Sequence, residues 1–267
     1  MSARAPSAWG AVRDALAAVH NLSALLRSTS VQSRTILDLL PELKVGAGLL
    51  HAAFERAVVG DAPGVEGAGE ASDAAVTVGA HGLKIVEAFD ALLAAIAASP
   101  GASTEDRESL ADRAGALADE LEAAADLLAL LDRAAAPVAT EVGLDLVARE
   151  AGRMSGTARG NELIVQFDGK SPECIVTTDP YVLGPLISLL IASVHAAGVN
   201  AIVLRARSAP KAHFIVEAAR LEDASLPSLS LRVTRWIAPS EAAMRRIAEQ
   251  IGAVLEVEGR RGTITLG

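Results

Sequence analysis

The first half of the chain has its apolar residues at helical spacing. This pattern runs through residues 8–58, with a break expected near Pro41 because proline cannot donate the helical hydrogen bond. Residues 59–73, VGDAPGVEGAGEASD, are Gly-rich and acidic, a composition typical of flexible linkers. Helical spacing then returns in two segments, at about 73–99 and 104–135. We therefore predict an N-terminal helical region, a linker and a pair of helices.

The pair of helices carries apolar seams of the kind found in helical bundles. Pro100 and Gly101 end the first helix, and Ser103 with Asp106 gives a capping-box-like start to the second. The short connection between them predicts an antiparallel hairpin. The seam comprises Leu110, Ala114, Leu117, Leu121, Ala124, Leu128 and Leu131 in the second helix, and Val78, Ile85, Val86, Ala88, Phe89, Leu92, Leu93, Ala95 and Ile96 in the first. A lone hairpin would leave this stripe exposed, so we expect dimerisation to complete a four-helix bundle.

After Pro137 the pattern changes to short runs that are rich in β-branched residues. The runs ELIVQFDG, ECIVTTD, AIVLRARS, HFIVEAARL, LSLRVTRW, AVLEVEG and GTITLG are bounded by turn residues and predict strands. Between them we expect helices at about 140–155, 180–197 and 240–251. The second of these is almost wholly apolar, and Asp179 is its expected N-cap. The pattern predicts an α+β domain with one mixed sheet and helices on one face.

Composition and charge narrow the possible functions. The chain is rich in Ala and Leu, has few aromatic residues and carries a net charge of −9, so a general nucleic-acid-binding role is not expected. A single cysteine, Cys174, excludes a disulfide framework and a cysteine-rich zinc site. The N-terminal stretch, which contains Asp14, lacks the apolar core of a signal peptide, and no run of about 18 apolar residues predicts a membrane span. We therefore expect a cytoplasmic protein without a membrane partner.

A helical hairpin followed by this order of strands and helices resembles the bacterial sensor histidine kinases. The strings TDPYVLGPLISLLIASVHAAG and EAAMRRIAEQIGAVLEVEGRRGTITLG resemble the nucleotide-binding helix and the closing helix and hairpin of their ATP-binding domain. The resemblance covers roughly residues 73–267 and implies an α/β-sandwich of the histidine-kinase ATPase type. The domains expected from this are a helical region at 1–58, a linker at 59–73, a dimerisation and phosphotransfer hairpin at 74–136 and an ATPase-like domain at 137–267.

The chain departs from this family at the residues that hold the nucleotide. In the family, an asparagine of the apolar helix binds magnesium; the corresponding residue here is Ser193, whose side chain is shorter and a weaker ligand. The family's adenine-reading aspartate lies in a glycine-rich loop, whereas here Glu222 and Asp223 stand in a segment without glycine. The glycine-rich lid is also missing. We therefore expect no ATP binding and no cofactor, and we interpret His195 as a residue of the helix end.

Two histidines are candidate phosphoacceptors, because a neutral imidazole nitrogen is the nucleophile in phosphorelay transfer. His81 lies near the start of the hairpin, where its placement resembles that of the kinase phosphoacceptor, although Gly82 replaces the usual acidic residue. His20, in HNLSALL, resembles the family's phosphoacceptor box more closely but lies outside the hairpin. Either could instead be an ordinary surface histidine, as we expect for His51 and His213.

The resemblance implies two alternative functions. The first is a histidine phosphotransferase-like protein that relays phosphoryl groups to or from response-regulator receiver domains without binding ATP. The second is a non-catalytic pseudokinase scaffold that docks and regulates a kinase or response regulator. Both readings imply a receiver domain or sensor kinase as partner, and both include a homodimer formed through the hairpin.

Overall fold

The computed structural model describes most of the chain. The described residues are 8–28, 33–59, 69–99, 101–143, 146–147, 151, 162–168, 175–208, 210–220, 223, 228–232 and 240–267. They form two compact units, Met1–Ala129 and Leu130–Gly267. The first unit is helical and the second combines strands and helices, so the chain is α+β as its sequence predicts.

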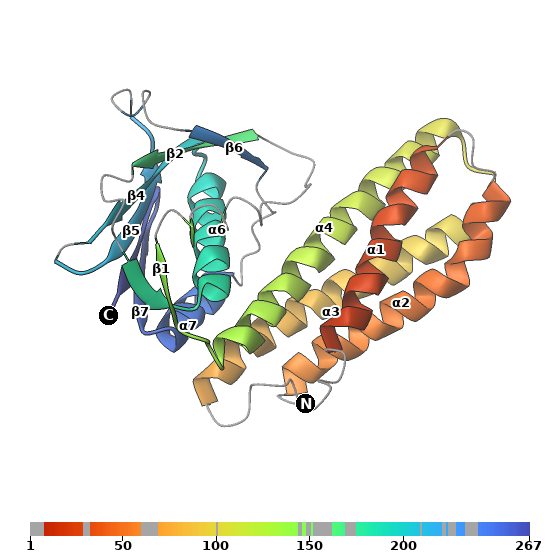
Figure 1. The fold of residues 1–267 in the computed structure, drawn as a ribbon. Coiled ribbons are helices and arrows are strands. Elements are labelled where there is room, and N and C mark those ends of the chain that lie inside the picture. Colours follow the sequence, from red (N-terminus) through yellow and green to blue (C-terminus); the bar gives the residue numbers. More distant parts are fainter. Residues whose placement is uncertain are drawn as a thin grey trace. The chain divides into compact units, whose positions relative to one another are not determined.

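Four long helices make up the first unit (Figure 1). They are α1 (Ala8–Arg27), α2 (Ser33–Val59), α3 (Gly69–Ala98) and α4 (Thr104–Ala134), the last turn of which belongs to the second unit. The predicted capping box begins α4: Ser103 Oγ lies 2.7 Å from Asp106 Oδ2, and the Asp106 amide donates back to Ser103 Oγ at 3.2 Å. The hairpin of α3 and α4 is thus formed where its sequence predicts.

The four-helix bundle is completed within one chain, which corrects the expectation that two hairpins must associate. Buried apolar residues come from all four helices, among them Leu22 of α1, Phe54 of α2, Phe89 of α3 and Leu121 of α4. Polar contacts also join the first helix to the last, since Ser23 Oγ donates to the Ala111 carbonyl at 2.9 Å. Because α1 and α2 cover the hairpin, the bundle needs no second copy to bury its seam. Homodimerisation stays a prediction.

Two helix boundaries differ from the sequence interpretation. The expected break near Pro41 is wrong, because α2 continues from Ser33 to Val59 with Pro41 inside it. Pro41 is exposed, and the buried side chains on either side of it, Leu40 and Leu43, hold the helix against the bundle despite the lost hydrogen bond. The expected linker at 59–73 is also too long, because its last residues, from Gly69, already belong to α3.

The second unit is built on a six-stranded mixed sheet. Its strands are β2 (Glu162–Asp168), β4 (Ala201–Arg207), β5 (His213–Ala218), β6 (Ser228–Arg232), β7 (Ala253–Glu258) and β8 (Arg261–Leu266), in the order β6-β2-β4-β5-β8-β7. The β2–β4 pair is parallel and the others are antiparallel. Two further strands, β1 (Thr140–Gly143) and β3 (Ile175–Thr178), form a separate antiparallel pair. All seven predicted strands are therefore confirmed, at least in part.

The helix expected at 140–155 is wrong at its start, because Thr140–Gly143 form β1. This segment pairs antiparallel with β3, matching Val142 with Val176 in the register. Thr140 and Val142 are β-branched, which favours a strand once a partner is available. Residues 146, 147 and 151 are helical, and the rest of the expected helix lies outside the described residues.

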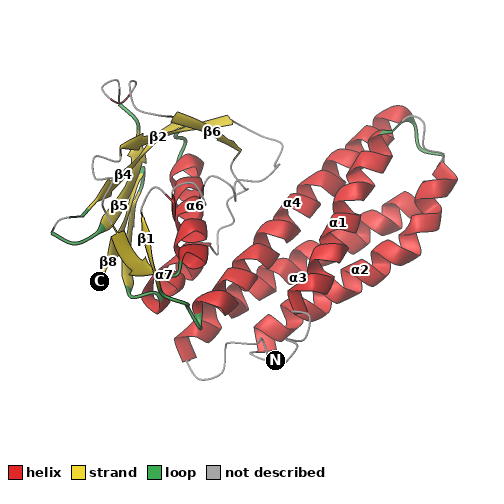
Figure 2. Ribbon diagram, viewed as in Figure 1, coloured by secondary structure: helices red, strands yellow, loops and turns green. Residues whose placement is uncertain are grey.

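Helices α6 (Pro180–Ala196) and α7 (Ser240–Gln250) lie on one side of the large sheet (Figure 2). The apolar sequence of α6 is explained by its position, since ten of its residues are buried, from Val182 to Val194. Gly262 of β8 lets α6 approach the sheet closely, because a Cβ there would stand 2.2 Å from Leu190 Cδ1. The predicted arrangement of helices on one face is confirmed for α6 and α7 (Figure 2), whereas the expected single sheet is wrong, because β3 pairs with β1 outside the large sheet. Among the described residues, no helix has the length and apolarity that a membrane crossing requires.

Candidate functional site

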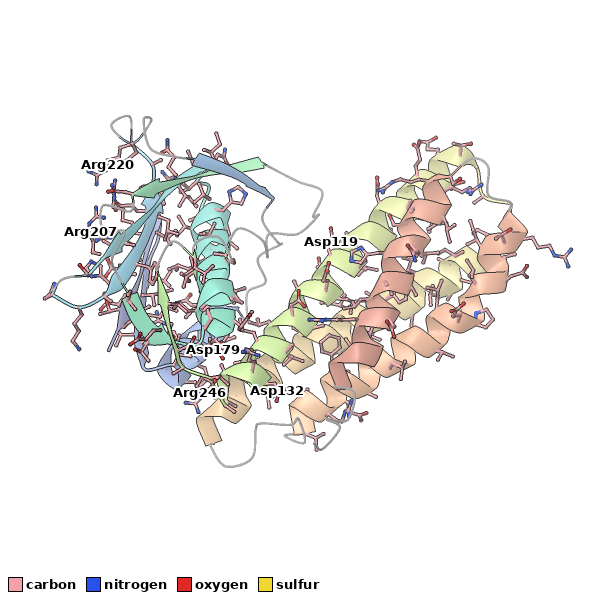
Figure 3. The ribbon with its side chains drawn as sticks, viewed as in Figure 1. Asp119, Asp132, Asp179, Arg207, Arg220 and Arg246 are labelled. Carbon is pink, nitrogen blue, oxygen red and sulfur yellow. The ribbon has the colours of Figure 1, made fainter. Side chains whose placement is uncertain are left out.

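The structure places two acidic side chains beside one of the two candidate histidines. They come from α4, a helix that is distant in the sequence. His20 of α1 faces α4, where its Nε2 lies 3.1 Å from Glu122 Oε2 and its Nδ1 lies 4.0 Å from Asp119 Oδ1. Figure 3 shows Asp119 on the side of α4 that faces α1. The exposed fractions of the three side chains are 37% for His20, 30% for Asp119 and 45% for Glu122, so solvent reaches each of them. We call His20, Asp119 and Glu122 the α1–α4 cluster.

The positions of these three residues follow from the helices that carry them. Val19 and Leu22, which flank His20, are fully or almost fully buried, so packing fixes the rotation of α1 and sets His20 at the edge of its apolar face. Asp119 and Glu122 are three residues apart on α4 and therefore lie on the same side of that helix. Buried Ala118 and Leu121 precede them and set the rotation of α4 in the same way.

The acidic neighbours change the acid–base behaviour of the imidazole. The hydrogen bond to Glu122 raises the pKa of His20 above its ordinary value, against the opposing effect of burial, and the charges of Glu122 and Asp119 add to the rise. The same hydrogen bond lowers the pKa of Glu122. The pair thus holds a proton between two groups, with Glu122 fixing the ring's orientation, as a carboxylate does for a catalytic histidine.

His81 is in a different environment. It is half-buried on α3, and its Nε2 is buried with no hydrogen-bond partner among the described residues. The neighbouring Gly82 is buried against α2, and a Cβ there would stand 2.4 Å from Phe54 Cδ1. The close packing of α3 against α2 therefore explains the glycine at this position. Among the described residues, no acidic side chain forms a hydrogen bond or ion pair with His81, so this histidine stays a candidate on sequence grounds alone.

The remaining histidines take part in local contacts. His51 is exposed on α2 with its Nδ1 3.9 Å from Glu55, one turn further along the helix. His195 Nδ1 lies 2.7 Å from the Val199 carbonyl, which places this ring at the C-terminal end of α6, as expected. His213 of β5 contacts the Lys211 carbonyl at 2.8 Å. It also lines a hollow on the open face of the sheet, together with basic and acidic residues that include Lys211, Arg261 and Glu256.

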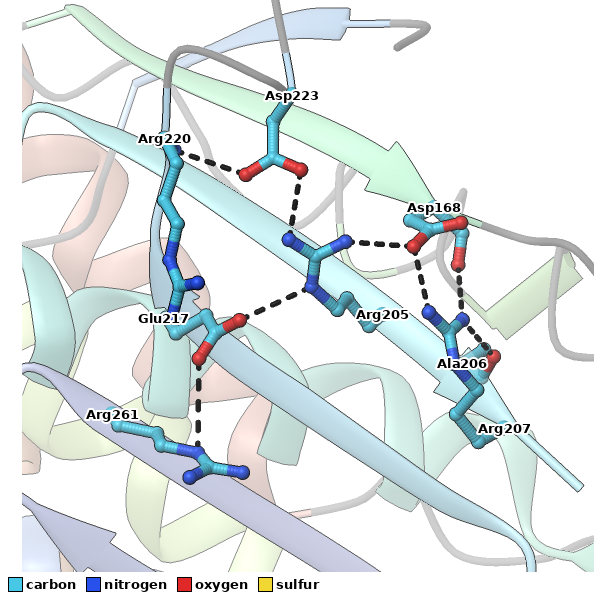
Figure 4. Close-up of polar contacts among 8 residues, drawn as sticks. All are labelled: Asp168, Arg205, Ala206, Arg207, Glu217, Arg220, Asp223 and Arg261. Carbon is cyan, nitrogen blue, oxygen red and sulfur yellow. Dashed lines mark hydrogen bonds and ion pairs between the residues drawn. The ribbon is translucent and has the colours of Figure 1, made fainter. Parts of the chain in front are cut away.

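One of the residues that the sequence interpretation compared with a nucleotide site, Asp223, is held by an ion-pair network. Asp223 accepts from Arg205 Nη2 at 2.8 Å and from the Arg220 amide at 2.9 Å (Figure 4). These bonds lower the pKa of Asp223, with the Arg220 amide as the larger cause. Ser193 is half-buried on α6. Glu222 and residues 233–239, part of the segment in which we expect no glycine-rich lid, lie outside the described residues.

Arg205 is the centre of this network. It lies on β4 and contacts Asp168 of β2 at 2.7 Å, Glu217 of β5 at 3.1 Å and Asp223, so one guanidinium joins three carboxylates (Figure 4). Asp168 also contacts Arg207 at 2.7 Å. The hydrogen bonds from Arg207 and Arg205 lower the pKa of Asp168. The network ties neighbouring strands together on the sheet face that α6 and α7 leave open.

Another buried carboxylate connects the end of α4 to the start of α6. Asp179, labelled in Figure 3, is the N-cap of α6 and accepts from the Tyr181 amide at 2.9 Å, as its sequence predicts. Its other oxygen accepts from the Val138 amide at 2.9 Å and from Arg133 Nη2 at 3.0 Å. The Arg133 guanidinium also lies over the Tyr181 ring, 5.0 Å from its centroid. Both carboxylate oxygens of Asp179 accept hydrogen bonds, and these bonds hold the start of α6 to the end of α4 within the second unit.

Sequence reasoning missed the acidic partners of His20. Asp119 and Glu122 lie about a hundred residues away in the chain, and as acidic residues of an amphipathic helix they read as an ordinary solvated face. Their only sequence signal is their spacing of three residues. The fold supplies the pairing with α1. Comparison with models of known protein families, and with curated proteins, found no match to this chain.

Proposed function

We propose that the protein is a histidine phosphotransferase-like signalling protein that exchanges phosphoryl groups with response-regulator receiver domains at His20. The observation that supports this most is the half-exposed imidazole of His20 on a four-helix bundle, held by Glu122 at 3.1 Å. A receiver domain can approach an exposed imidazole on a helical surface. Phosphoryl transfer then depends chiefly on how the donor and the acceptor are positioned. His81 offers a poorer nucleophile, because its Nε2 is buried and has no hydrogen-bond partner in the part of the chain that the structure describes.

The proposed transfer uses the residues of the α1–α4 cluster in defined roles. Glu122 holds the ring proton at Nε2, so the lone pair of neutral His20 lies on Nδ1, and Glu122 accepts the Nε2 proton as the ring gains the phosphoryl group. That lone pair forms an N–P bond while the P–O bond to the receiver's aspartate breaks, and the aspartate leaves as a carboxylate. The receiver supplies the magnesium ion that neutralises charge on the phosphoryl group. The reverse reaction follows the same path, so the protein relays in either direction.

The proposal includes no ATP binding. It is supported by Asp223, the candidate for the family's adenine-reading aspartate, which is engaged by Arg205 and the Arg220 amide. A carboxylate used in this way has fewer free lone pairs for a base. Ser193 adds to this, because a hydroxyl in place of an amide is a poor substitute as a magnesium ligand.

A second candidate function, the pseudokinase scaffold, is favoured by a separate observation. Val45 and Leu49 lie one turn apart on the outer face of α2 with exposed fractions of 67% and 44%. Exposed apolar side chains on one helix face are typical of protein docking surfaces. A scaffold would use such a face without any phosphorylated histidine, so the same experiment distinguishes the two functions.

The test is phosphoryl transfer from receiver domains of the same genome that have been labelled with [³²P]acetyl phosphate. Each labelled receiver is mixed with the full chain and with the variants His20→Gln and His81→Gln, which retain side-chain bulk. We expect acid-labile, alkali-stable label on the wild type and on His81→Gln, and at least a hundredfold less on His20→Gln. Label that persists on His20→Gln would overturn the assignment of His20. Absence of label from the wild type with every receiver would favour the scaffold.

A further inference from the structure

We propose that the α1–α4 cluster is also a site for a divalent transition-metal ion, with Zn²⁺ as the cation it fits best. The inference goes beyond the proposed function and does not rest on it, because metal binding is measured without any phosphoryl donor. The site is formed by His20 of α1 and by Asp119 and Glu122 of α4.

The three residues bring suitable donor atoms together. One ligand atom from each residue can be chosen so that all three lie within 4.8 Å of one another, and the closest pair, His20 Nε2 and Glu122 Oε2, is 3.1 Å apart. Ligands of a tetrahedral zinc ion at about 2.0 Å lie a little over 3 Å from each other. Small rotations of the Asp119 and Glu122 side chains, which are partly exposed, are therefore enough to close the donor set around one ion.

The local charge also favours a dication. Two carboxylates face a single imidazole, and a third, Asp126, stands one turn beyond Glu122 on α4. On α1, the charge of Arg13 acts on Asp126. Carboxylates that face one imidazole attract a dication, which displaces any proton from the ring nitrogen that it binds.

The donor types select among cations. An imidazole with two carboxylates suits zinc and other first-row transition metals, whereas Mg²⁺ and Ca²⁺ prefer sites made of oxygen atoms alone. Three protein ligands leave a fourth position for water, as in sites that are not purely structural. Since ligands come from both α1 and α4, a bound ion also links the first and last helices of the bundle.

The consequence for His20 is a competition. A metal ion bound at the ring nitrogen occupies the lone pair that an N–P bond requires. Metal binding and phosphorylation at this residue therefore exclude each other, and zinc is expected to inhibit phosphoryl transfer if the proposed function is correct. The binding itself is expected whether or not transfer occurs.

The experiment is isothermal titration of chelator-treated protein with ZnCl₂ in a buffer free of phosphate. The full chain carries Cys174→Ser throughout, to remove its one thiol. We expect one zinc ion per chain, at least tenfold weaker binding in His20→Gln and in Glu122→Gln, and no measurable uptake of Mg²⁺. The matched control is His51→Gln, because His51 and Glu55 form a comparable pair at 3.9 Å without a third candidate ligand among the described residues.

Two readouts keep the result decisive. Circular dichroism confirms that each variant is folded, and thermal unfolding should show that zinc raises the Tm of the wild type and of His51→Gln but not of His20→Gln. Equal zinc affinity in the wild type, His20→Gln and Glu122→Gln would overturn the site, as would absence of binding to the wild type. A zinc site without phosphoryl transfer would leave this inference standing and remove the proposed function.

Discussion

At the scale of single residues, a residue that departs from a functional motif can have a packing role. Gly82 is an example, because the sequence suggests a phosphoacceptor motif that has lost its acid, whereas the structure shows a glycine pressed against the Phe54 ring. The spacing of apolar residues in the sequence correctly predicts that His81 and Gly82 lie on a helix. It carries no information on which neighbour lies opposite, and that neighbour decides the role of each residue.

Gly82→Ala should therefore destabilise the bundle. The added Cβ would overlap the Phe54 ring at 2.4 Å, and overpacking of this kind costs about 1–3 kcal/mol, offset in part by the better helix propensity of alanine. Gly48→Ala is the matched control, because no atom lies within 4 Å of its Cβ position on the same bundle. Urea unfolding should show a loss for Gly82→Ala and no loss, or a small gain, for Gly48→Ala.

Arg205 gives the second prediction at this scale. Arg205→Met removes the partner of three carboxylates and leaves Asp168, whose side chain is 5% exposed, with Arg207 alone. Arg261→Met is the control, because Arg261 is 56% exposed and its ion pair among the described residues is with Glu217 at 3.8 Å. Thermal unfolding should show a clear fall in Tm for Arg205→Met and almost none for Arg261→Met. Equal effects of the two substitutions would contradict a central role for Arg205.

At the scale of elements, local signals in the sequence were informative where the element's own residues decide its form. The N-cap Asp179 followed by Pro180 predicts the start of α6, and Gly252, with φ +71°, marks the turn after α7. Pro41 shows the limit, because the packing of α2 overrides the tendency of proline to break a helix. Residues 140–143 show it again, because their strand exists only through pairing with β3.

The start of α6 can be tested directly. Asp179→Ala removes the acceptor for the Tyr181 and Val138 amides and the partner of Arg133, so we expect a loss of about 1–3 kcal/mol in the free energy of unfolding. Asp179→Asn keeps one oxygen for the cap but loses the charge that faces Arg133, so its loss should be smaller. Denaturant unfolding followed by circular dichroism measures both, and a larger loss for Asn than for Ala would contradict this role.

At the scale of the whole molecule, the sequence predicts the α+β class and the helical bundle but not how the bundle is completed. A wide apolar stripe on a hairpin indicates that further helices must pack against it. Here these helices are α1 and α2 of the same chain. The α1–α4 cluster depends on that arrangement, since its residues come from the first and last helices of the bundle. Such pairings are set by tertiary packing, which helical periodicity does not encode.

The ion-pair network predicts how the second unit responds to acid. The pKa values of Asp168 and Asp223 are lowered in the folded chain, so the stability that these groups contribute is complete above their unfolded pKa, about 3.9 for aspartate, and is lost as the pH falls through the lower folded values. Acid titration of the wild type should show a loss of stability below about pH 4. Arg205→Met should flatten this acid dependence, and an unchanged profile would contradict the network's role.

The central claim is that His20 is the reactive imidazole of the chain. The most direct measurement is mass-spectrometric mapping, by electron-transfer fragmentation, of the full chain after incubation with a phosphorylated receiver domain. The account predicts phosphohistidine at His20 and none at His81. A phosphoryl group located on His81, or on any residue other than His20, would contradict it.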